Sequence, residues 1–269
     1  MTICINESLR TVLPNLKKYK PTEMQIVPLY AETFYRRIWA TIEEKGLTNK
    51  VKTGIKLSNA LLKVGIDVRR KLFKDIHDNF GGELLILICG GAPLKPHLTE
   101  FFESIGIVMI NGYGITECGP LISINRPEYH NFEAVGLPLK DTEVKIFEPN
   151  ENGEGEIIVK GRNVMLGYYK NQAATDEVIV DGFFHTGDIG KLDENGFVYI
   201  TGRKKNLIVL KNGKNIYPEE IENALLDIPY ISEVVVYSAN IAGEENKALG
   251  AEIFPNVEKA NADGIKDVE

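Results

Sequence analysis

Hydrophobic residues in the first half of the chain follow two different spacings. Phe34, Ile38 and Ile42 recur along one helical face and Gly46 follows them, which is typical of an amphipathic helix and its end. Continuous apolar runs instead indicate strands buried on both faces of a parallel sheet. We expect a short strand within residues 22–30 that Pro28 stops, and strands over residues 83–91 and 107–114. We expect helices over residues 31–45, 66–80 and 94–106. The strand–helix–strand order between Leu84 and Asn111 predicts a parallel sheet.

The pattern changes after Pro127, where polar and apolar residues alternate around turns rich in Asn, Asp and Gly. Alternation around such turns predicts antiparallel hairpins. Pro218 and the acids after it suit the first turn of a helix. We expect one hairpin over residues 142–161, two more over 185–215, a helix over 218–227, strands over 231–239 and 247–255, and a frayed polar tail over 256–269.

Together these patterns predict a mixed α/β protein in three parts. Residues 1–130 form a parallel-sheet α/β subdomain, residues 131–204 an antiparallel β subdomain, and residues 205–269 part of a small α+β domain. A chain of 269 residues is long enough to bury a sizeable core and suggests about one or two domains.

Composition narrows the set of partners. The formal net charge of −7 is unfavourable for a general nucleic-acid binder, which needs a basic face, so we expect no nucleic acid as a partner. Cys4, Cys89 and Cys118 lie far apart, without a zinc or disulfide pattern, which fits the reducing cytoplasm. No run of about 18 apolar residues occurs, so we expect no membrane span.

Other polar features have plain structural interpretations. The four histidines show no metal-binding spacing, and we interpret them as surface or loop residues; His185 lies beside a motif and suggests orientation rather than ligation. Trp39 and its aromatic neighbours are expected to pack in a core. The charged run over residues 67–75 is interpreted as a solvated helix face.

Two motifs follow the predicted buried strands. Gly90 and Gly91 end the first, where they would let a flat ligand approach the backbone, although an ordinary strand-to-helix turn also explains them. After the second, Tyr113 offers a ring for stacking, Thr116 a hydroxyl, and Glu117 an oxygen ligand suited to Mg²⁺ beside phosphates. The alternative is that these side chains only line a turn. Both motifs should lie at the same edge of the sheet.

Two further features come later in the chain. Asp188 lies between two glycines in "HTGDIG", where a carboxylate could bind a ribose diol or could only stabilise its own turn. The basic loop over residues 202–222 could serve nucleic acid, a nucleotide or a solvated hairpin. The sequence contains neither GxxxxGK[ST] nor a strand-GxGxxG-helix unit, so a P-loop NTPase or a Rossmann dehydrogenase is unsupported.

The order of the motifs is more specific than any one of them. GGAPL, YGITE, GEIIVKGRNVMLGYYKNQAAT, HTGD and GRKKNLIVLKNGKNIYPEEIE occur in turn. In this order the chain resembles the adenylate-forming enzymes over about residues 84–254; these include acyl-CoA synthetases, luciferases and peptide-synthetase adenylation domains. Residues 3–39 resemble the long-chain fatty acyl-CoA ligase branch.

The resemblance implies a ligase reaction in two steps, with a fatty acid, ATP and coenzyme A as ligands. A fatty carboxylate attacks the α-phosphorus of ATP to give acyl-AMP and pyrophosphate, and the thiol of coenzyme A then releases AMP. The resemblance also implies that residues 1–130 are the C-terminal part of the adenylation subdomain and that residues 205–269 are the incomplete start of a small lid domain.

The resemblance also assigns roles to residues. Thr116 would contact phosphate, Glu117 would hold Mg²⁺, and Asp188 with Arg203 would bind the ribose of ATP or AMP. Lys205 falls at the family's hinge. The remaining residues implied in binding adenine or coenzyme A are Gly90, Gly91, Ala92, Asn111, Gly112, Tyr113, Gly114, Lys211, Gly213 and Lys214.

The sequence departs from the family pattern in three places. It contains no loop of the type TSGTTGxPKG and no PxTxxGKIxR-like segment, and Asn206 stands where many members have Asp. We therefore expect a C-terminal fragment that is a very poor ligase by itself, because the phosphate cradle and the lid lysine are missing. An uncovered sheet edge would favour self-association, and peripheral membrane contact stays open.

Two other functions remain open. The acyl acceptor could be an acyl-carrier protein or a thiolation domain instead of coenzyme A. A truncated paralogue could also bind nucleotide without turnover.

Overall fold

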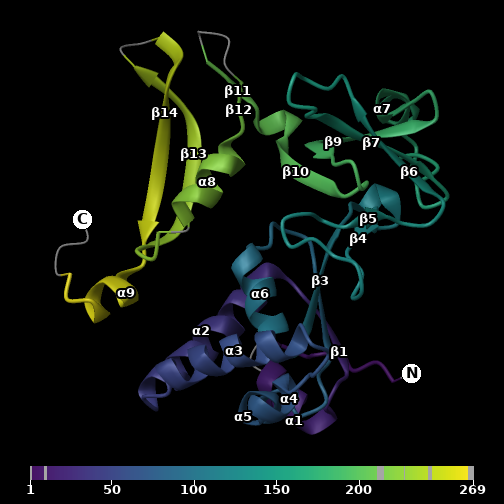
Figure 1. The fold of residues 1–269 in the computed structure, drawn as a ribbon. Helices are drawn as coiled ribbons and strands as arrows, with labels where there is room; N and C mark the ends of the chain where they lie inside the picture. The colour runs from purple at the N-terminus through teal and green to yellow at the C-terminus, as the bar shows by residue number, and fades with distance from the viewer. Residues whose placement is uncertain (1, 9–10, 211–214, 227, 242–243, 266–269) are drawn as a thin grey trace. The chain divides into compact units, whose positions relative to one another are not determined.

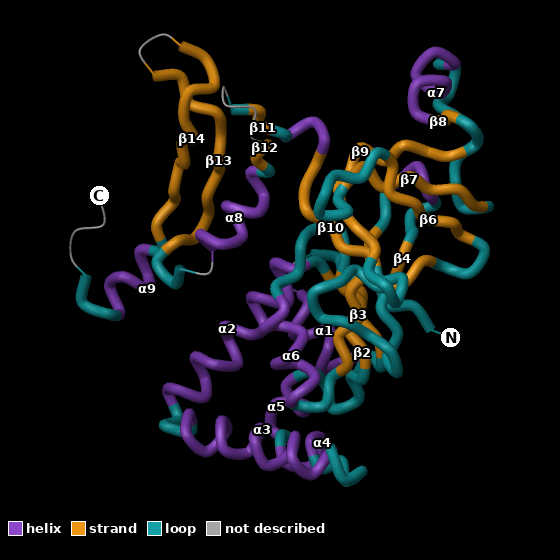
Figure 2. The backbone as a smooth tube through the Cα atoms, turned by 45° about the horizontal axis from the view of Figure 1, so that its top comes forward, coloured by secondary structure: helices purple, strands orange, loops and turns teal. Residues whose placement is uncertain are grey.

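A computed structural model describes residues 2–8, 11–210, 215–226, 228–241 and 244–265. The chain divides into two compact units, Met1–Thr142 and Glu143–Glu269, and each is described by itself below. Figure 1 shows the order of the elements and Figure 2 the distribution of helix and strand along the backbone.

The first unit is built on a five-stranded sheet of order β1-β2-β3-β4-β5. The first three strands pair in parallel, as the sequence predicts, and two short antiparallel strands extend the sheet. Each observed strand is shorter than the range predicted for it. Pro28 stops the first strand, as predicted, and is also the first residue of a helix. The strands are β1 (Glu23–Ile26), β2 (Ile86–Cys89), β3 (Val108–Tyr113), β4 (Ser123–Ile124) and β5 (Leu137–Pro138).

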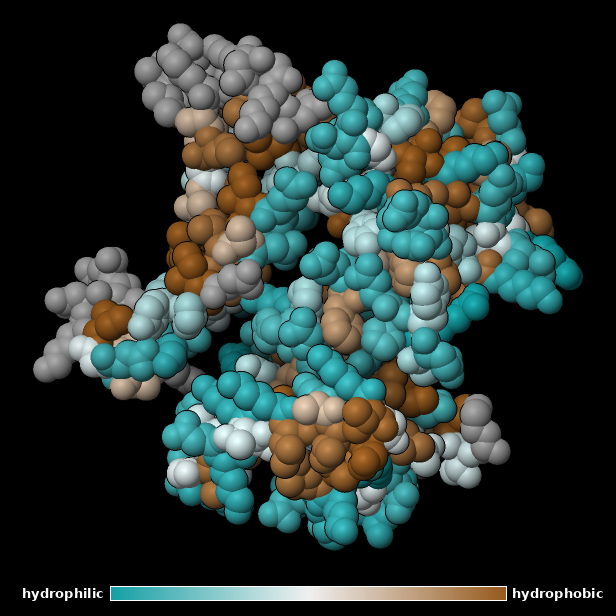
Figure 3. Space-filling view, viewed as in Figure 1, coloured by the Kyte–Doolittle hydropathy of each residue, from teal (hydrophilic) through white to brown (hydrophobic). Residues whose placement is uncertain are grey.

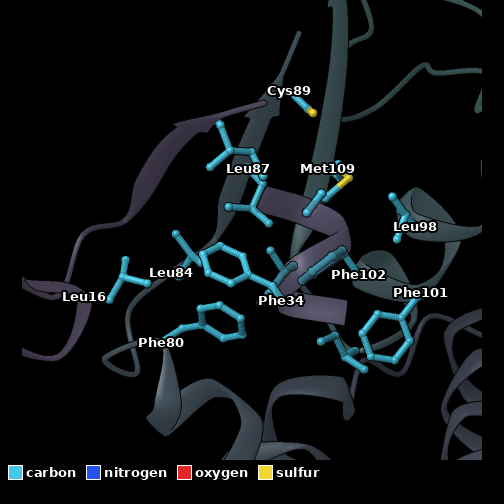
Figure 4. Close-up of a cluster of buried hydrophobic side chains, with 14 of the residues drawn as sticks. Leu16, Phe34, Phe80, Leu84, Leu87, Cys89, Leu98, Phe101, Phe102 and Met109 are labelled. Carbon is cyan, nitrogen blue, oxygen red and sulfur yellow. The ribbon is translucent and has the colours of Figure 1, made fainter. Parts of the chain in front are cut away.

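Helices pack against this sheet around a core that includes Leu16, Phe34, Leu87, Phe102 and Met109, all almost fully buried (Figure 4). Trp39 packs against the same core, as predicted. The helices are α1 (Val12–Tyr19), α2 (Pro28–Glu44), α3 (Thr48–Leu62), α4 (Arg69–Leu72), α5 (Lys74–Asn79) and α6 (Pro96–Ser104). Within the described part of the chain, no helix combines the length and the apolar composition needed to cross a bilayer.

The single helix predicted over residues 66–80 is wrong. The chain leaves helical geometry at Phe73, which is buried, and forms α4 and α5 on either side. The charged run is solvated in part, since Asp67, Lys71, Lys74 and Asp75 are exposed. The Arg70 guanidinium instead donates to the carbonyl oxygens of Leu84 at 2.8 Å and Gly82 at 2.7 Å. His77, predicted at the surface, is 3% exposed.

The second unit contains an antiparallel sheet of order β10-β9-β7-β6, with β8 paired to β9. This confirms the predicted hairpin over residues 142–161, whose turn is closed by Asn150: its side-chain oxygen accepts from the backbone of Asn152 at 2.9 Å and Glu154 at 3.0 Å. The elements are β6 (Thr142–Phe147), β7 (Gly155–Gly161), α7 (Gln172–Val178), β8 (Ile179–Val180), β9 (Phe183–Leu192) and β10 (Val198–Arg203).

The last elements also follow the predicted order, with one exception. The tail predicted as frayed contains a helix at residues 257–262, because the Asn256 side chain accepts from the Lys259 backbone at 3.1 Å and caps its first turn. The elements are β11 (Ile208–Val209), β12 (Asn215–Ile216), α8 (Pro218–Leu226), β13 (Ile231–Ile241), β14 (Glu244–Pro255) and α9 (Val257–Ala262). The predicted mixed α/β fold class is confirmed.

Candidate functional site

Two glycine turns lie side by side at the carboxyl edge of the parallel strands. The register pairs Cys89 of β2 with Asn111 of β3. A Cβ atom on Gly90 would lie 3.1 Å from the carbonyl oxygen of Gly112, so the two backbones approach closely. The edge at the carboxyl ends of parallel strands is where ligands of open α/β sheets bind. The sequence argument that both motifs share one edge is therefore confirmed by the strand register.

Backbone is accessible at this edge. Gly91 has a φ of +86° and no atom within 4 Å of where its Cβ would lie, so its conformation and not crowding favours glycine. Gly91, Ala92 and Gly114 are exposed. A planar group could therefore lie against the backbone at Gly91.

The side chains at the end of β3 and in the turn after it differ in accessibility. Asn111 is 7% and Tyr113 is 6% exposed, whereas Thr116 is exposed and Glu117 half-buried on a 3₁₀ turn at Thr116–Cys118. Burial, followed by the nearby Glu117 charge, raises the pKa of the Cys118 thiol to about 11, which keeps it neutral. Thr116 and Glu117 are thus the accessible polar groups of this turn, and stacking on Tyr113 stays a prediction.

The described residues contain no group of three or more His, Cys, Asp or Glu side chains that could hold a metal ion. Mg²⁺ in nucleotide sites is commonly bound by one or two carboxylates together with substrate phosphates and water. Glu117 therefore fits Mg²⁺ only as a ligand shared with a nucleotide.

In the second unit, Asp188 and Arg203 are cross-strand partners on β9 and β10. The Arg203 Nε lies 3.0 Å from Asp188 Oδ1; the Asp188 side chain is 5% and the Arg203 side chain 64% exposed. Three residues of β9, from Thr186 to Asp188, stand opposite Ile157 alone, and such a bulge redirects side chains. The structure thus brings together the two residues that the resemblance assigns to the ribose.

Glu156 is a residue of this region that the sequence analysis missed. Its buried carboxylate accepts from the Gly187 backbone, from His185 Nδ1 and from the Lys204 ammonium, each at 3.0 Å. Burial acts to raise the pKa of Glu156, but the hydrogen bonds from His185, Lys204 and Gly187 outweigh it, and the pKa lies below its usual range. The available signal was an acid opening the apolar run "EIIV". His185, interpreted from the sequence as a surface or loop residue, lies on β9 and hydrogen-bonds Glu156; its orienting role stays a prediction.

The segment after β10 is a short 3₁₀ helix, Lys204–Asn206, in which Lys205 is exposed. The Asn206 amide donates to Glu219 on α8, so this position has a partner although the family's Asp is absent. Lys211, Gly213 and Lys214 lie outside the described residues. The hinge role of Lys205 and the convergence of the two sets of residues, one in each unit, stay predictions.

Comparisons with known proteins show which family the chain resembles. The sequence pattern of the AMP-binding enzyme family matches residues 1–169. The chain is 31% identical, over 93% of its length, to the long-chain-fatty-acid–CoA ligase FadD15 of Mycobacterium bovis. It is also 31% identical, over 94% of its length, to the Arabidopsis thaliana chloroplastic long-chain-fatty-acid–[acyl-carrier-protein] ligase AEE15. It spans 42% of each of these two relatives.

A solved structure gives the same picture. The o-succinylbenzoate coenzyme A synthetase of Bacillus subtilis, in complex with ATP and magnesium ion, matches 93% of this chain and 45% of its own, with 26% identity and a TM-score of 0.65. Fold, motif order and these comparisons define an adenylate-forming protein. The chain belongs to the AMP-binding enzyme family.

Proposed function

We propose that this chain is part of an ATP-dependent ligase that activates a long-chain fatty acid and transfers it to coenzyme A in the cytoplasm. A carboxylate oxygen attacks the α-phosphorus of ATP and pyrophosphate leaves; the thiol sulfur of coenzyme A then attacks the acyl carbonyl and AMP leaves. The named activity of the Mycobacterium bovis relative supports this substrate class. The carrying observation is the pair of glycine turns, Gly90 beside Gly112, at the carboxyl edge of the sheet.

The proposal gives each group one task. Gly90, Gly91 and Ala92 lie against adenine on one side, and the segment 111–114, with the Tyr113 ring, on the other. Thr116 donates its hydroxyl to a phosphate oxygen. Glu117 would hold Mg²⁺, which when bound neutralises phosphate charge.

The second unit supplies the ribose contacts and the thiol acceptor site. The Asp188 carboxylate, which Arg203 contacts at 3.0 Å, accepts from the ribose hydroxyls. Lys205 is the hinge of the lid. Lys211, Gly213 and Lys214 meet coenzyme A, whose phosphates suit the local lysines.

An acyl-carrier protein as the acceptor is the second candidate, because the Arabidopsis relative is named for that reaction. Supplying palmitoyl-AMP with either coenzyme A or a phosphopantetheinylated carrier protein separates the two. A thioester formed only on the carrier protein would favour the second candidate.

The nucleotide site is tested by calorimetry with AMP. Ala92→Phe places a ring on the exposed glycine edge and should weaken AMP binding at least about tenfold, which is about 1.4 kcal/mol. Ala60→Phe, at an exposed position on α3, is the matched control and should bind like the parent chain. Unchanged melting temperatures would show that both variants are folded.

The same titration tests whether the second unit meets the same nucleotide. Asp188→Asn should lower AMP affinity by about tenfold or more, whereas Asp176→Asn on the exposed face of α7 should not. Loss of affinity in Ala92→Phe with none in Asp188→Asn would limit the site to the first unit. Failure of the parent chain to bind AMP would contradict the proposal.

A further inference from the structure

The first unit contains a cavity of about 980 Å³ between α1, α2, α3 and the pair α4 and α5. Its floor is apolar and belongs to the buried core, with Phe34, Ile42, Phe73 and Phe80 among the lining residues. Figure 3 shows hydrophobic residues gathered on the helical part of this unit, bordered by hydrophilic ones. Cavities of roughly 300–1,000 Å³ with such linings are the usual sites of small-molecule ligands.

The rim of this cavity is basic, although the whole chain carries a formal charge of −7. Two acidic side chains, Glu44 and Asp75, also line it. The basic residues outnumber them three to one and come from the five helices α1 to α5, with Lys45 directly after α2; they are Lys17, Arg37, Lys45, Lys50, Lys71 and Lys74. A ring of cations around an apolar interior is complementary to an anionic head group joined to an apolar chain.

The cavity is distinct from the nucleotide edge. Helix α2 begins at Pro28, just after the carboxyl end of β1. The residues of α2 that line the cavity start only at Phe34, and the lining continues past the end of the helix to Leu47. The helix therefore runs from the glycine edge toward the opposite edge of the sheet. None of Gly90, Gly91, Ala92 or residues 111–117 lines the cavity.

We propose that this cavity is a second lipid site, which binds one long-chain fatty acid with its chain against Phe34 and Phe73 and its carboxylate at the basic rim. Burial of each methylene group against an apolar floor favours binding. An extended peptide fits less well, because its backbone N–H and C=O groups need hydrogen-bond partners. Thr41 and Asn79 are the uncharged polar side chains lining the cavity, which is too few for a peptide backbone. The site acts apart from the acyl-activating chemistry and does not rest on it.

Trp39, the single tryptophan of the chain, is a built-in probe. It lies on α2 between the lining residues Ile38 and Ala40. Dibromostearate should quench Trp39 fluorescence saturably with one site per chain, and palmitate should compete. Hexadecanol, which has the chain without the charge, should bind at least about tenfold more weakly, because it cannot use the cationic rim.

Matched variants locate the site. Thr41→Phe narrows the cavity from an exposed position and should weaken binding at least tenfold, whereas Thr53→Phe, exposed on α3 and outside the lining, should not. Lys50→Glu should weaken palmitate binding and leave hexadecanol binding unchanged. Lys56→Glu, on the same helix but outside the rim, is its control. Circular dichroism checks that each variant is folded.

Several outcomes would overturn the proposal. Quenching that does not saturate, or equal affinity in Thr41→Phe and Thr53→Phe, would show that the lipid binds elsewhere. Competition by AMP, or loss of binding in Ala92→Phe, would put the fatty acid at the nucleotide edge. A dimer in light scattering that Thr41→Phe dissociates, without saturable quenching, would show that a second copy covers the cavity. None of these readouts requires ligase activity, so the two proposals can fail separately.

Discussion

At the scale of single residues, the carboxylate of Glu156 is buried and held by three hydrogen-bond donors. Its two oxygens accept from a backbone amide, an imidazole and an ammonium. Asp188 is adjacent to one of these donors, Gly187, and its own backbone amide donates to Thr186 Oγ1 at 3.1 Å. Because Glu156 fixes the residues on either side of Thr186, it positions the bulge that carries Asp188.

We predict that Glu156→Gln lowers the free energy of unfolding of the second unit by about 1–3 kcal/mol at neutral pH. Glutamine keeps the shape of the side chain and an oxygen that can accept from the Gly187 amide. Its NH2 group, however, would face the two donors His185 and Lys204, and the side chain carries no negative charge. The pKa of Glu156 is lowered in the folded protein. Its stabilisation is therefore present above the ordinary glutamate pKa of about 4.3 and is lost as pH falls through the lower folded value.

Urea denaturation of parent and variant chains between pH 3 and pH 8 measures this difference. The difference in unfolding free energy between the parent chain and Glu156→Gln should be constant near neutral pH and should disappear in acid. Glu151→Gln, in the exposed turn between β6 and β7, is the control and should change stability by less than about 0.5 kcal/mol. A gap that persists unchanged at the acid end would show that the charge of Glu156 contributes nothing.

At the scale of elements, helix α9 depends on a few local contacts. Its six residues are too few to be stable alone. Besides the Asn256 cap, Tyr230 donates to Asp263 at 3.0 Å and Lys259 pairs with the same carboxylate at 2.9 Å. Asn256→Ala should destabilise the helix by about 1 kcal/mol. Faster amide exchange at Ala260, with unchanged exchange at Val198, would show this; equal protection at Ala260 in both chains would contradict it.

The elements that were predicted correctly are those whose determinants are local. Pro28 stops β1 and starts α2, and the Asn150 turn closes its hairpin within five residues, so the sequence around each is sufficient. The break at Phe73 depends instead on burial and on Arg70 reaching carbonyls beyond the helix, which periodicity does not report. The cap on α9 is local, and it was missed because polar composition outweighed the Asn256 signal.

The same distinction applies to the candidate site. The glycine edge could be predicted because parallel strands present their carboxyl ends at one edge. Glu156 could not, because its partners His185 and Lys204 lie 29 and 48 residues away. A pairing over that distance depends on the strand order and on the bulge in β9, neither of which is encoded in a short motif.

At the scale of the whole molecule, the chain is organised as two compact units with separate sheets. Leu87 on β2 and Ile157 on β7 are fully buried, one in each unit. Trp39 belongs to the first unit and therefore reports on it alone. Chains with more than one such unit commonly depart from two-state unfolding, so stability should be measured for each unit.

We predict that tryptophan fluorescence and far-ultraviolet circular dichroism give different urea midpoints. Leu87→Ala should destabilise the first unit by about 2–5 kcal/mol, through lost burial and the cavity left behind, and should shift the fluorescence transition. Ile157→Ala should cost the second unit a similar free energy, and should shift the dichroism transition while leaving the fluorescence midpoint in place. A single coincident transition in the parent chain, displaced equally by both substitutions, would show that the two units unfold together.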